Sequence, residues 1–145
     1  MQPIGKLISN LQTENGTKVE INLTGTPSGL KNIDKQTYGF QNGTLTILAG
    51  RPGMGTTTLA LNITRYASTK HNKRIAVFSL DQTAEQLTKD ILKAELEASF
   101  IDYDKLDNYQ EAKIKKVAQA AIYIDDTQCI SIFELMERAY LLKSQ

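Results

Sequence analysis

Apolar residues along this chain alternate between two spacings, and the change of spacing predicts the order of its elements. Apolar side chains recur every three or four positions, as in helices, at residues 57–68, 83–98, 108–119 and 131–142. Short apolar runs of the kind that form buried strands stand before or between these segments. They predict strands at residues 44–48, 74–80 and 121–124. Strands that alternate with helices predict an α/β fold with a parallel sheet and right-handed crossovers.

Two of these helices carry a sequence signal for their first turn. Thr83 with Gln86, and Ser131 with Glu134, have the spacing of a capping box. In that arrangement the two side chains bond to backbone N–H groups that the helix itself leaves free. Residues 25–43 are instead rich in Gly, Pro, Ser and Asn, and we expect one helical turn there, around Leu30 and Ile33.

A short amphipathic helix is predicted ahead of this body, directly after Pro3. Its apolar face consists of Ile4, Leu7, Ile8 and Leu11. The stripe can fold back onto its own domain or dock on a neighbouring subunit, and the pattern alone does not decide between them. We therefore divide the chain into a linker helix and connector at residues 1–23 and a main domain at residues 24–145.

One Gly-rich segment follows a predicted strand and opens a predicted helix, which is the context of a phosphate-binding loop. The segment consists of Gly50, Arg51, Pro52, Gly53, Met54, Gly55, Thr56, Thr57 and Thr58. The glycines let backbone N–H groups turn toward phosphates, and the start of the helix adds a favourable dipole. The hydroxyl of Thr57 is expected to hold Mg²⁺. A ligand-free turn is the alternative, which the agreement of spacing and flanking elements disfavours.

Position 56 departs from the loop pattern, because Thr56 stands where the pattern has Lys. The lysine side chain brings a positive charge to the β- and γ-phosphates, whereas a threonine donates one hydrogen bond and brings no charge. Loss of one such preorganised donor typically lowers a rate by about 10²–10³. We therefore expect the binding of ATP and Mg²⁺ to be weak or lost.

The charge and composition of the chain limit which partners it can bind, namely nucleic acid, membranes or other proteins. The formal net charge of +1 gives no general attraction to nucleic acid, so contact with DNA has to come from a local patch or from an assembly. We expect the basic run at residues 70–74 to be solvated surface. No stretch approaches the about 18 apolar residues of a membrane helix, so no membrane partner is expected. The single cysteine, Cys129, is typical of a reducing compartment, and we place the chain in the cytoplasm.

Taken together, these motifs stand in the same order as in the ATPase domain of DnaB-type hexameric helicases, which residues 24–142 resemble. The resemblance rests on five blocks, at residues 25–34, 43–55, 76–80, 122–127 and 130–135. The Arg-Pro-x-Met-Gly form of the loop is more specific than a bare Gly-rich loop. The resemblance implies a RecA-like P-loop NTPase fold, with a partial parallel sheet, flanking helices and a preceding linker helix.

The resemblance also implies a function, namely ATP-dependent unwinding of duplex DNA in replication, with ATP and Mg²⁺ as cofactors. It implies other helicase subunits as partners, either copies of this chain or a replicative helicase paralogue, with the linker helix docked on the adjacent subunit. It further implies that DNA is contacted only through the assembly.

Two departures from the family pattern qualify this function. Asp81 stands where the family has a Glu that orients the attacking water. A misplacement of ~1 Å in such a group can cost about 10²-fold in rate. The family's Walker B strand, arginine finger and DNA-binding loops have no counterpart in this sequence, so we expect a truncated motor with little ATP hydrolysis of its own. A catalytically inactive paralogue that regulates a replicative helicase is the alternative, and a remnant without activity is a third.

Two further carboxylates, Asp125 and Asp126, follow the last predicted strand. Carboxylates in that place can hold Mg²⁺. The family pattern places this strand before the true metal-binding strand, and residues such as Asp126 and Thr127 commonly turn a chain. We expect the second role.

Overall fold

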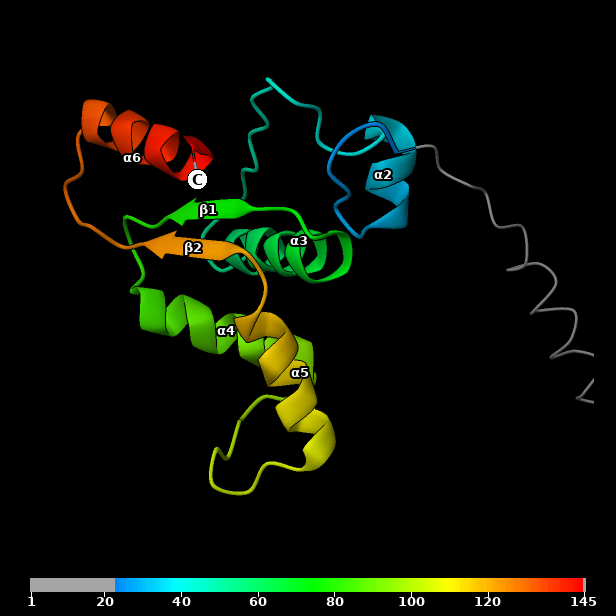
Figure 1. Ribbon diagram of the computed structural model, residues 1–145. Coiled ribbons are helices and arrows are strands. Elements are labelled where there is room, and N and C mark those ends of the chain that lie inside the picture. The colour runs from blue at the N-terminus through cyan, green and yellow to red at the C-terminus, as the bar shows by residue number, and fades with distance from the viewer. Residues whose placement is uncertain (1–22, 145) are drawn as a thin grey trace, which may run out of the picture.

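Two parallel strands lie at the centre of the part of the chain that the computed structural model describes, residues 23–144 (Figure 1). They are β1 (Ile75–Phe78) and β2 (Ile122–Asp125). Ile75 lies opposite Ile122, and Phe78 lies opposite Asp125. The predicted α/β class and parallel pairing are therefore confirmed, although β1 is shorter than the run at residues 74–80.

The described residues also form five helices, which are placed around this sheet. They are α2 (Lys31–Thr37), α3 (Thr56–His71), α4 (Ala84–Leu96), α5 (Asn108–Ala118) and α6 (Ile132–Ser144). In Figure 1, α3 and α4 lie on one side of the strands and α6 on the other. Helix α5 packs against α4 and α3, and α6 contacts β1. None of these helices is long and apolar enough to cross a membrane.

The core forms on the α3–α4 side of the sheet. Val77 of β1 and Ile124 of β2 pack against a buried cluster that consists of Leu61, Leu87 and Ile91. Successive strand residues point to opposite faces, so their neighbours Ala76 and Tyr123 face α6 instead. Tyr123 keeps 42% of its surface exposed, so α6 covers its side of the sheet only in part.

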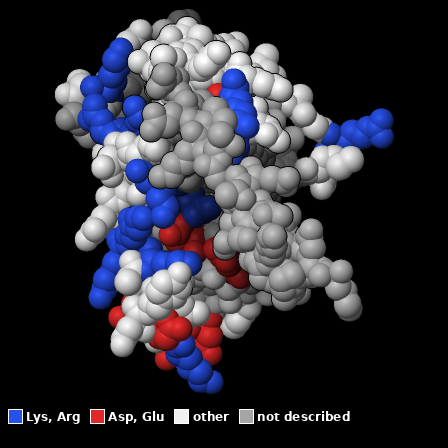
Figure 2. Space-filling model, turned by 90° about the vertical axis from the view of Figure 1, so that its right-hand side faces the viewer, with Lys and Arg blue, Asp and Glu red and all other residues white. Residues whose placement is uncertain are grey.

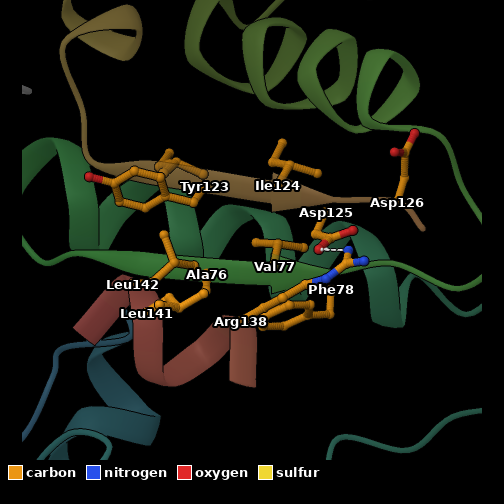
Figure 3. A pocket seen from close by; sticks show the side chains of 11 residues that line it. Ala76, Val77, Phe78, Tyr123, Ile124, Asp125, Asp126, Arg138, Leu141 and Leu142 are labelled. Atoms are coloured by element: carbon orange, nitrogen blue, oxygen red, sulfur yellow. Dashed lines mark hydrogen bonds and ion pairs between the residues drawn. The ribbon is translucent and has the colours of Figure 1, made fainter. Parts of the chain in front are cut away.

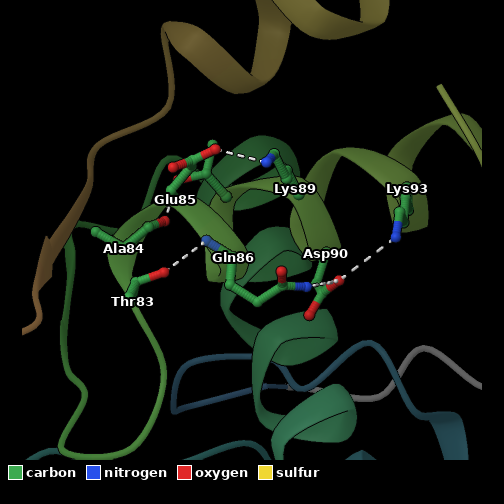
Figure 4. Close-up of polar contacts among 8 residues, drawn as sticks. Thr83, Ala84, Glu85, Gln86, Lys89, Asp90 and Lys93 are labelled. Atoms are coloured by element: carbon green, nitrogen blue, oxygen red, sulfur yellow. Dashed lines mark hydrogen bonds and ion pairs between the residues drawn. The ribbon is translucent and has the colours of Figure 1, made fainter. Parts of the chain in front are cut away.

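The helix starts follow the predicted caps, with one difference. Ser131 and Glu134 form both bonds of the capping box, at 2.9 and 3.2 Å. The hydroxyl of Thr83 accepts from the backbone N–H of Gln86 at 3.3 Å, as expected. The Gln86 side chain does not return that bond and instead donates to Asp90 at 3.1 Å (Figure 4). The box at Thr83 is therefore only half formed.

The strand predicted at residues 44–48 is wrong. This segment belongs to no strand, and no backbone hydrogen bond joins it to another segment within residues 23–144. Leu45 and Ile47 are 86% and 79% exposed. A strand is stabilised by a hydrogen-bonded neighbour, and in the described part of the chain β1 and β2 pair only with each other. Residues 44–48 favour a strand but have no strand beside them to bond with. They therefore form a connection without regular structure that leads into α3.

The Gly-rich region before this connection is more ordered than expected. Residues 31–37 form the two-turn helix α2, where one helical turn was predicted around Leu30 and Ile33. The buried carboxylate of Asp34 accepts hydrogen bonds from the backbone N–H groups of Ser28 and Gly29, at 2.8 and 3.2 Å. A Cβ at Gly29 would lie 2.6 Å from the ring of Tyr66, so the turn packs closely on α3. This block therefore anchors α2 to the domain.

Candidate functional site

The candidate phosphate-binding loop lies where the sequence placed it, directly before α3. Gly53 and Gly55 have φ of +78° and +80°, a left-handed conformation that favours glycine. Apart from the two chain neighbours, no atom of residues 23–144 lies within 4 Å of the position that a Cβ would take at either residue. Gly55 is the N-cap of α3, and the N–H of Met54 donates to the carbonyl of Arg51 at 3.1 Å. The loop is exposed, so its backbone is open to a ligand.

Thr56 is the first residue of α3, and its side chain turns back toward the start of the loop. A Cβ at Gly50 would lie 2.8 Å from the Cγ2 methyl group of Thr56. The side chain at position 56 therefore lies against the loop that would hold the phosphates. Because this side chain is uncharged, the loop has no cation at the position where the pattern requires one.

Thr57 and Asp81 line one pocket of about 290 Å³, although they come from different elements. Thr57 belongs to the first turn of α3, and Asp81 follows the carboxyl end of β1. The start of a helix and the end of a neighbouring parallel strand meet at one edge of the sheet, where ligands of such folds bind. The structure therefore brings together the proposed Mg²⁺ residue and the proposed catalytic carboxylate. Thr58 is exposed beside them.

The turn that carries Asp81 is held by Ser79. The Ser79 hydroxyl donates to the carbonyl of Gln82 at 2.6 Å and accepts from the Gln82 N–H at 3.1 Å. The backbone N–H of Ser79 also donates to the carbonyl of Asp125 at 2.8 Å, which ties the turn to β2. The Asp81 carboxylate has no hydrogen bond or ion pair with any residue in the described part of the chain. The role of Ser79 was not predicted from the sequence. The only sequence feature that indicates it is the three-residue spacing between Ser79 and Gln82.

Asp125 and Asp126 bond to protein groups, in agreement with the structural role expected for them. Asp125 forms an ion pair with Arg138 at 2.5 Å, which is drawn in Figure 3. The Thr127 hydroxyl and, next, the Arg138 guanidinium lower the pKa of Asp125 to about 2. Asp126 accepts from the N–H of Ala84 at 2.8 Å. Across residues 23–144, no group of three or more His, Cys, Asp or Glu side chains could hold a metal ion.

The remaining predicted site residues are those of the linker helix. Ile4, Leu7, Ile8 and Leu11 lie outside the described residues. The proposed docking of this helix on an adjacent subunit therefore stays a prediction.

Comparison with known proteins shows the family to which this chain is related. A sequence profile of the DnaB-like helicase C terminal domain matches residues 25–145. The replicative DNA helicase DnaB of Geobacillus stearothermophilus and the replicative DNA helicase DnaC of Bacillus subtilis are each 36% identical over 129 residues. Each alignment covers 85% of this chain and 28% of the relative, so the chain matches little more than a quarter of their length.

Two solved structures share the fold. One is described as an ATPase domain, and the other as a DnaB-like replicative helicase studied with its interactions with primase. Each superposes over 99% of this chain with a TM-score of 0.73 and 22% sequence identity, and the superposition covers 53% and 39% of those two chains. The RecA-like α/β fold is thereby confirmed. On the profile match over most of its length, this chain belongs to the DnaB-like helicase C-terminal domain family.

Proposed function

We propose that this chain is the nucleotide-binding part of a DnaB-type replicative helicase motor and that it hydrolyses little ATP on its own. The observation that carries the proposal is the pocket shared by Thr57 and Asp81 beside a loop that has no cation at Thr56. Unwinding of duplex DNA driven by ATP is then the activity of a complete motor, to which this part contributes the phosphate cradle.

The residues of the loop suit a nucleotide in shape but only partly in charge. The open left-handed turns at Gly53 and Gly55 leave room for phosphate oxygens next to backbone N–H groups. The Thr57 hydroxyl would hold Mg²⁺, and the bound ion would neutralise charge on the phosphates. The Asp81 carboxylate would orient a water molecule. The Thr56 side chain is uncharged and shorter than that of lysine, so we expect ATP and Mg²⁺ to bind weakly.

The proposed partners are other helicase subunits, either copies of this chain or a replicative helicase paralogue. Large apolar side chains are exposed on α6 and before α3, among them Phe133 at 80% and Leu45 at 86%. Exposed apolar surface of this extent is typical of protein–protein contact sites. The linker residues Leu7 and Leu11 would add a second contact.

One alternative is favoured by a specific observation. The missing charge at Thr56 also suits a catalytically inactive paralogue that joins a replicative helicase and regulates it. In that case the chain would alter the activity of the helicase without binding nucleotide itself.

The test measures phosphate release from ATP by this chain alone, by a complete replicative helicase and by mixtures of the two, and it measures ATP binding by the chain with titration calorimetry. The proposal expects background turnover from the chain alone and Mg²⁺-dependent ATP binding once position 56 carries Lys. The regulatory alternative expects the helicase rate to change with the amount of chain added. This change should be the same for the unmodified chain and for the Thr56→Lys variant. Rapid turnover by the unmodified chain alone would contradict both.

A further inference from the structure

Charged side chains in residues 23–144 lie at the surface or are bonded in the interior. Figure 2 shows one face of the molecule, where Lys and Arg side chains gather along one side with Asp and Glu side chains among them lower down. Asp34 and Glu95 are the two buried charged residues of this part of the chain, and both are bonded. A buried polar atom without a bond costs free energy, so such atoms are rare. Where one occurs, a requirement other than stability is indicated.

Three buried side-chain atoms have no hydrogen-bond partner among the described residues. They are Nε of Arg65, Oγ of Ser68 and Oε1 of Gln82. Arg65 and Ser68 belong to α3 and do not line the pocket of about 290 Å³ that Thr57 and Asp81 share. Gln82 does line this pocket. The unbonded oxygen of Gln82 therefore lies at the candidate nucleotide site.

The turn that carries Gln82 is fixed, although its side-chain oxygen is unbonded. The Ser79 hydroxyl bonds both the carbonyl and the N–H of Gln82, and the N–H of Ser79 bonds the end of β2. Asp81 directly precedes Gln82, and its carboxylate has no hydrogen bond or ion pair within residues 23–144. Two oxygen acceptors on adjacent residues of a fixed turn therefore line one pocket without a protein partner.

A water molecule suits two such acceptors, because it donates two hydrogen bonds. Acceptors on both O–H groups determine where the lone pairs of the water oxygen point. A phosphate oxygen would instead be repelled by the Gln82 oxygen and by the Asp81 carboxylate. In P-loop enzymes a side-chain acceptor orients the attacking water. Because Asp81 is one methylene shorter than the Glu of the family pattern, a second acceptor would hold a water that Asp81 alone leaves free to rotate.

We propose that Gln82 is a second water-orienting residue and acts together with Asp81, an inference that rests on the proposed binding of ATP in this pocket. The water oxygen forms its bond to the terminal phosphorus while the bond from that phosphorus to the bridging oxygen breaks. ADP leaves with the electron pair of the broken bond. One water proton goes to Asp81 and then to solvent, and the other stays on the released phosphate. Gln82 accepts a hydrogen bond and exchanges no proton.

The experiment uses the full chain with Thr56→Lys, because the unmodified chain is expected to bind nucleotide weakly. ADP that carries a fluorescent N-methylanthraniloyl group is titrated with Mg²⁺, with and without aluminium fluoride. Aluminium fluoride beside ADP imitates the phosphoryl group in transfer, so it should tighten ADP binding. Adding Gln82→Met should reduce this tightening about three- to tenfold, the effect of one lost hydrogen bond. The affinity for ADP alone should change less than twofold.

Thermal melting without nucleotide distinguishes this role from a structural one. Gln82→Met replaces a buried unbonded oxygen with an apolar group of similar size, so the melting temperature should rise by about 3 °C or more. Gln82→Ala removes the same oxygen without adding volume and should lose the same factor of tightening, which keeps the test valid if the Met variant does not fold. Gln128→Met is the matched control, since Gln128 is exposed in the turn after β2 and should affect neither measurement.

Each contrary result has a separate meaning. Equal tightening with and without Gln82→Met would overturn the inference, as would an equal loss of affinity for ADP alone. A lower melting temperature with unchanged tightening would give Gln82 a structural role instead. If aluminium fluoride does not tighten ADP binding to the Thr56→Lys chain, the inference fails while nucleotide binding stands. If that chain binds no ADP under either condition, the proposed function fails and this inference fails with it.

Discussion

The carboxylate of Asp126 accepts a hydrogen bond of 2.8 Å from the backbone N–H of Ala84, a residue that lies 42 positions earlier in the sequence. Asp126 directly follows β2, and Ala84 is the first residue of α4. Together with the Thr83 hydroxyl, this carboxylate satisfies N–H groups that α4 itself leaves free, and it brings negative charge to the positive end of the helix dipole. The end of β2 therefore stabilises the start of α4, three residues after Asp81.

Replacing Asp126 should destabilise the domain through this contact. Asp126→Ala leaves the Ala84 N–H without its partner, and loss of a capping side chain typically costs about 1 kcal/mol. Urea denaturation followed by circular dichroism measures the change in the free energy of unfolding. Asp104→Ala is the control, because Asp104 is exposed and its carboxylate has no bond within residues 23–144. Equal effects of the two substitutions would show that the contact does not stabilise α4.

Features that depend on neighbouring residues were predictable from the sequence, and the helix starts are the clearest case. Ser131 and Glu134 are three residues apart, so their reciprocal bonds follow from local geometry alone. The loop before α3 was predictable for the same reason, since the spacing of its glycines determines the turn. The half-formed box at Thr83 could not be foreseen, because Asp90 competes for the Gln86 side chain one turn later.

Features that depend on distant residues were missed or wrong. Residues 44–48 have strand-forming side chains, but a strand also requires a neighbour, and the sequence pattern does not reveal whether one is present. The closeness of Thr57 and Asp81 was implied only by the family resemblance, because 24 positions separate them in the sequence.

Restoring the charge at position 56 should strengthen nucleotide binding. A hydrogen bond to a charged group contributes about 1.5–3 kcal/mol, so Thr56→Lys should bind Mg²⁺-ATP roughly ten- to a hundredfold more tightly than the unmodified chain. Titration calorimetry measures both affinities. Thr58→Lys is the matched control, since it adds the same charge to an exposed neighbouring position and should have no such effect. Tight binding of ATP by the unmodified chain would contradict the role assigned to Thr56.

Acid should weaken the contact between Asp125 and Arg138. The pKa of Asp125 falls from 3.8 to about 2 in the folded domain, because Thr127 and Arg138 bond to the charged carboxylate. The unfolded chain therefore binds this proton at higher pH than the folded chain does. The stability that the carboxylate contributes is fully present above pH 3.8 and is lost as the pH falls toward 2.

The variant Asp125→Asn should lack this component of acid sensitivity. Thermal melting at a series of pH values should place Asp125→Asn below the unmodified chain at neutral pH, and the difference should shrink between about pH 4 and pH 2. Asp104→Asn should follow the unmodified chain throughout. A difference in melting temperature that stays constant down to pH 2 would mean that the charge of Asp125 does not stabilise the fold.

The linker stripe should affect association without affecting the fold. Leu7→Ser/Leu11→Ser removes apolar surface from the proposed docking helix, so self-association or binding to a replicative helicase should weaken. Analytical ultracentrifugation measures association, and circular dichroism measures the fold. Asn10→Ser/Gln12→Ser changes polar positions of the same segment and should leave association unchanged. If the leucine variant associates as the unmodified chain does, the stripe has a different role.

The exposed apolar segment before α3 should make the isolated chain associate. Leu45 and Ile47 are 86% and 79% exposed, and the backbone of residues 44–49 has no hydrogen bond to another segment in the described part of the chain. Extended apolar segments with free backbone groups readily pair with other chains. Thermal melting with light scattering at several protein concentrations should therefore give a melting behaviour that depends on concentration. Leu45→Ser/Ile47→Ser should reduce the scattering without lowering the melting temperature, because these side chains bury little surface.

Phe100 offers a matched control for Leu45 and Ile47 in the same measurement. Phe100→Ser removes a side chain that is 78% exposed but lies in the connection between α4 and α5, and it should reduce scattering less than the Leu45→Ser/Ile47→Ser variant does. A monomer with a high melting temperature that is independent of concentration would show that the domain is self-sufficient. The exposed segment would then be stable in water without a partner chain.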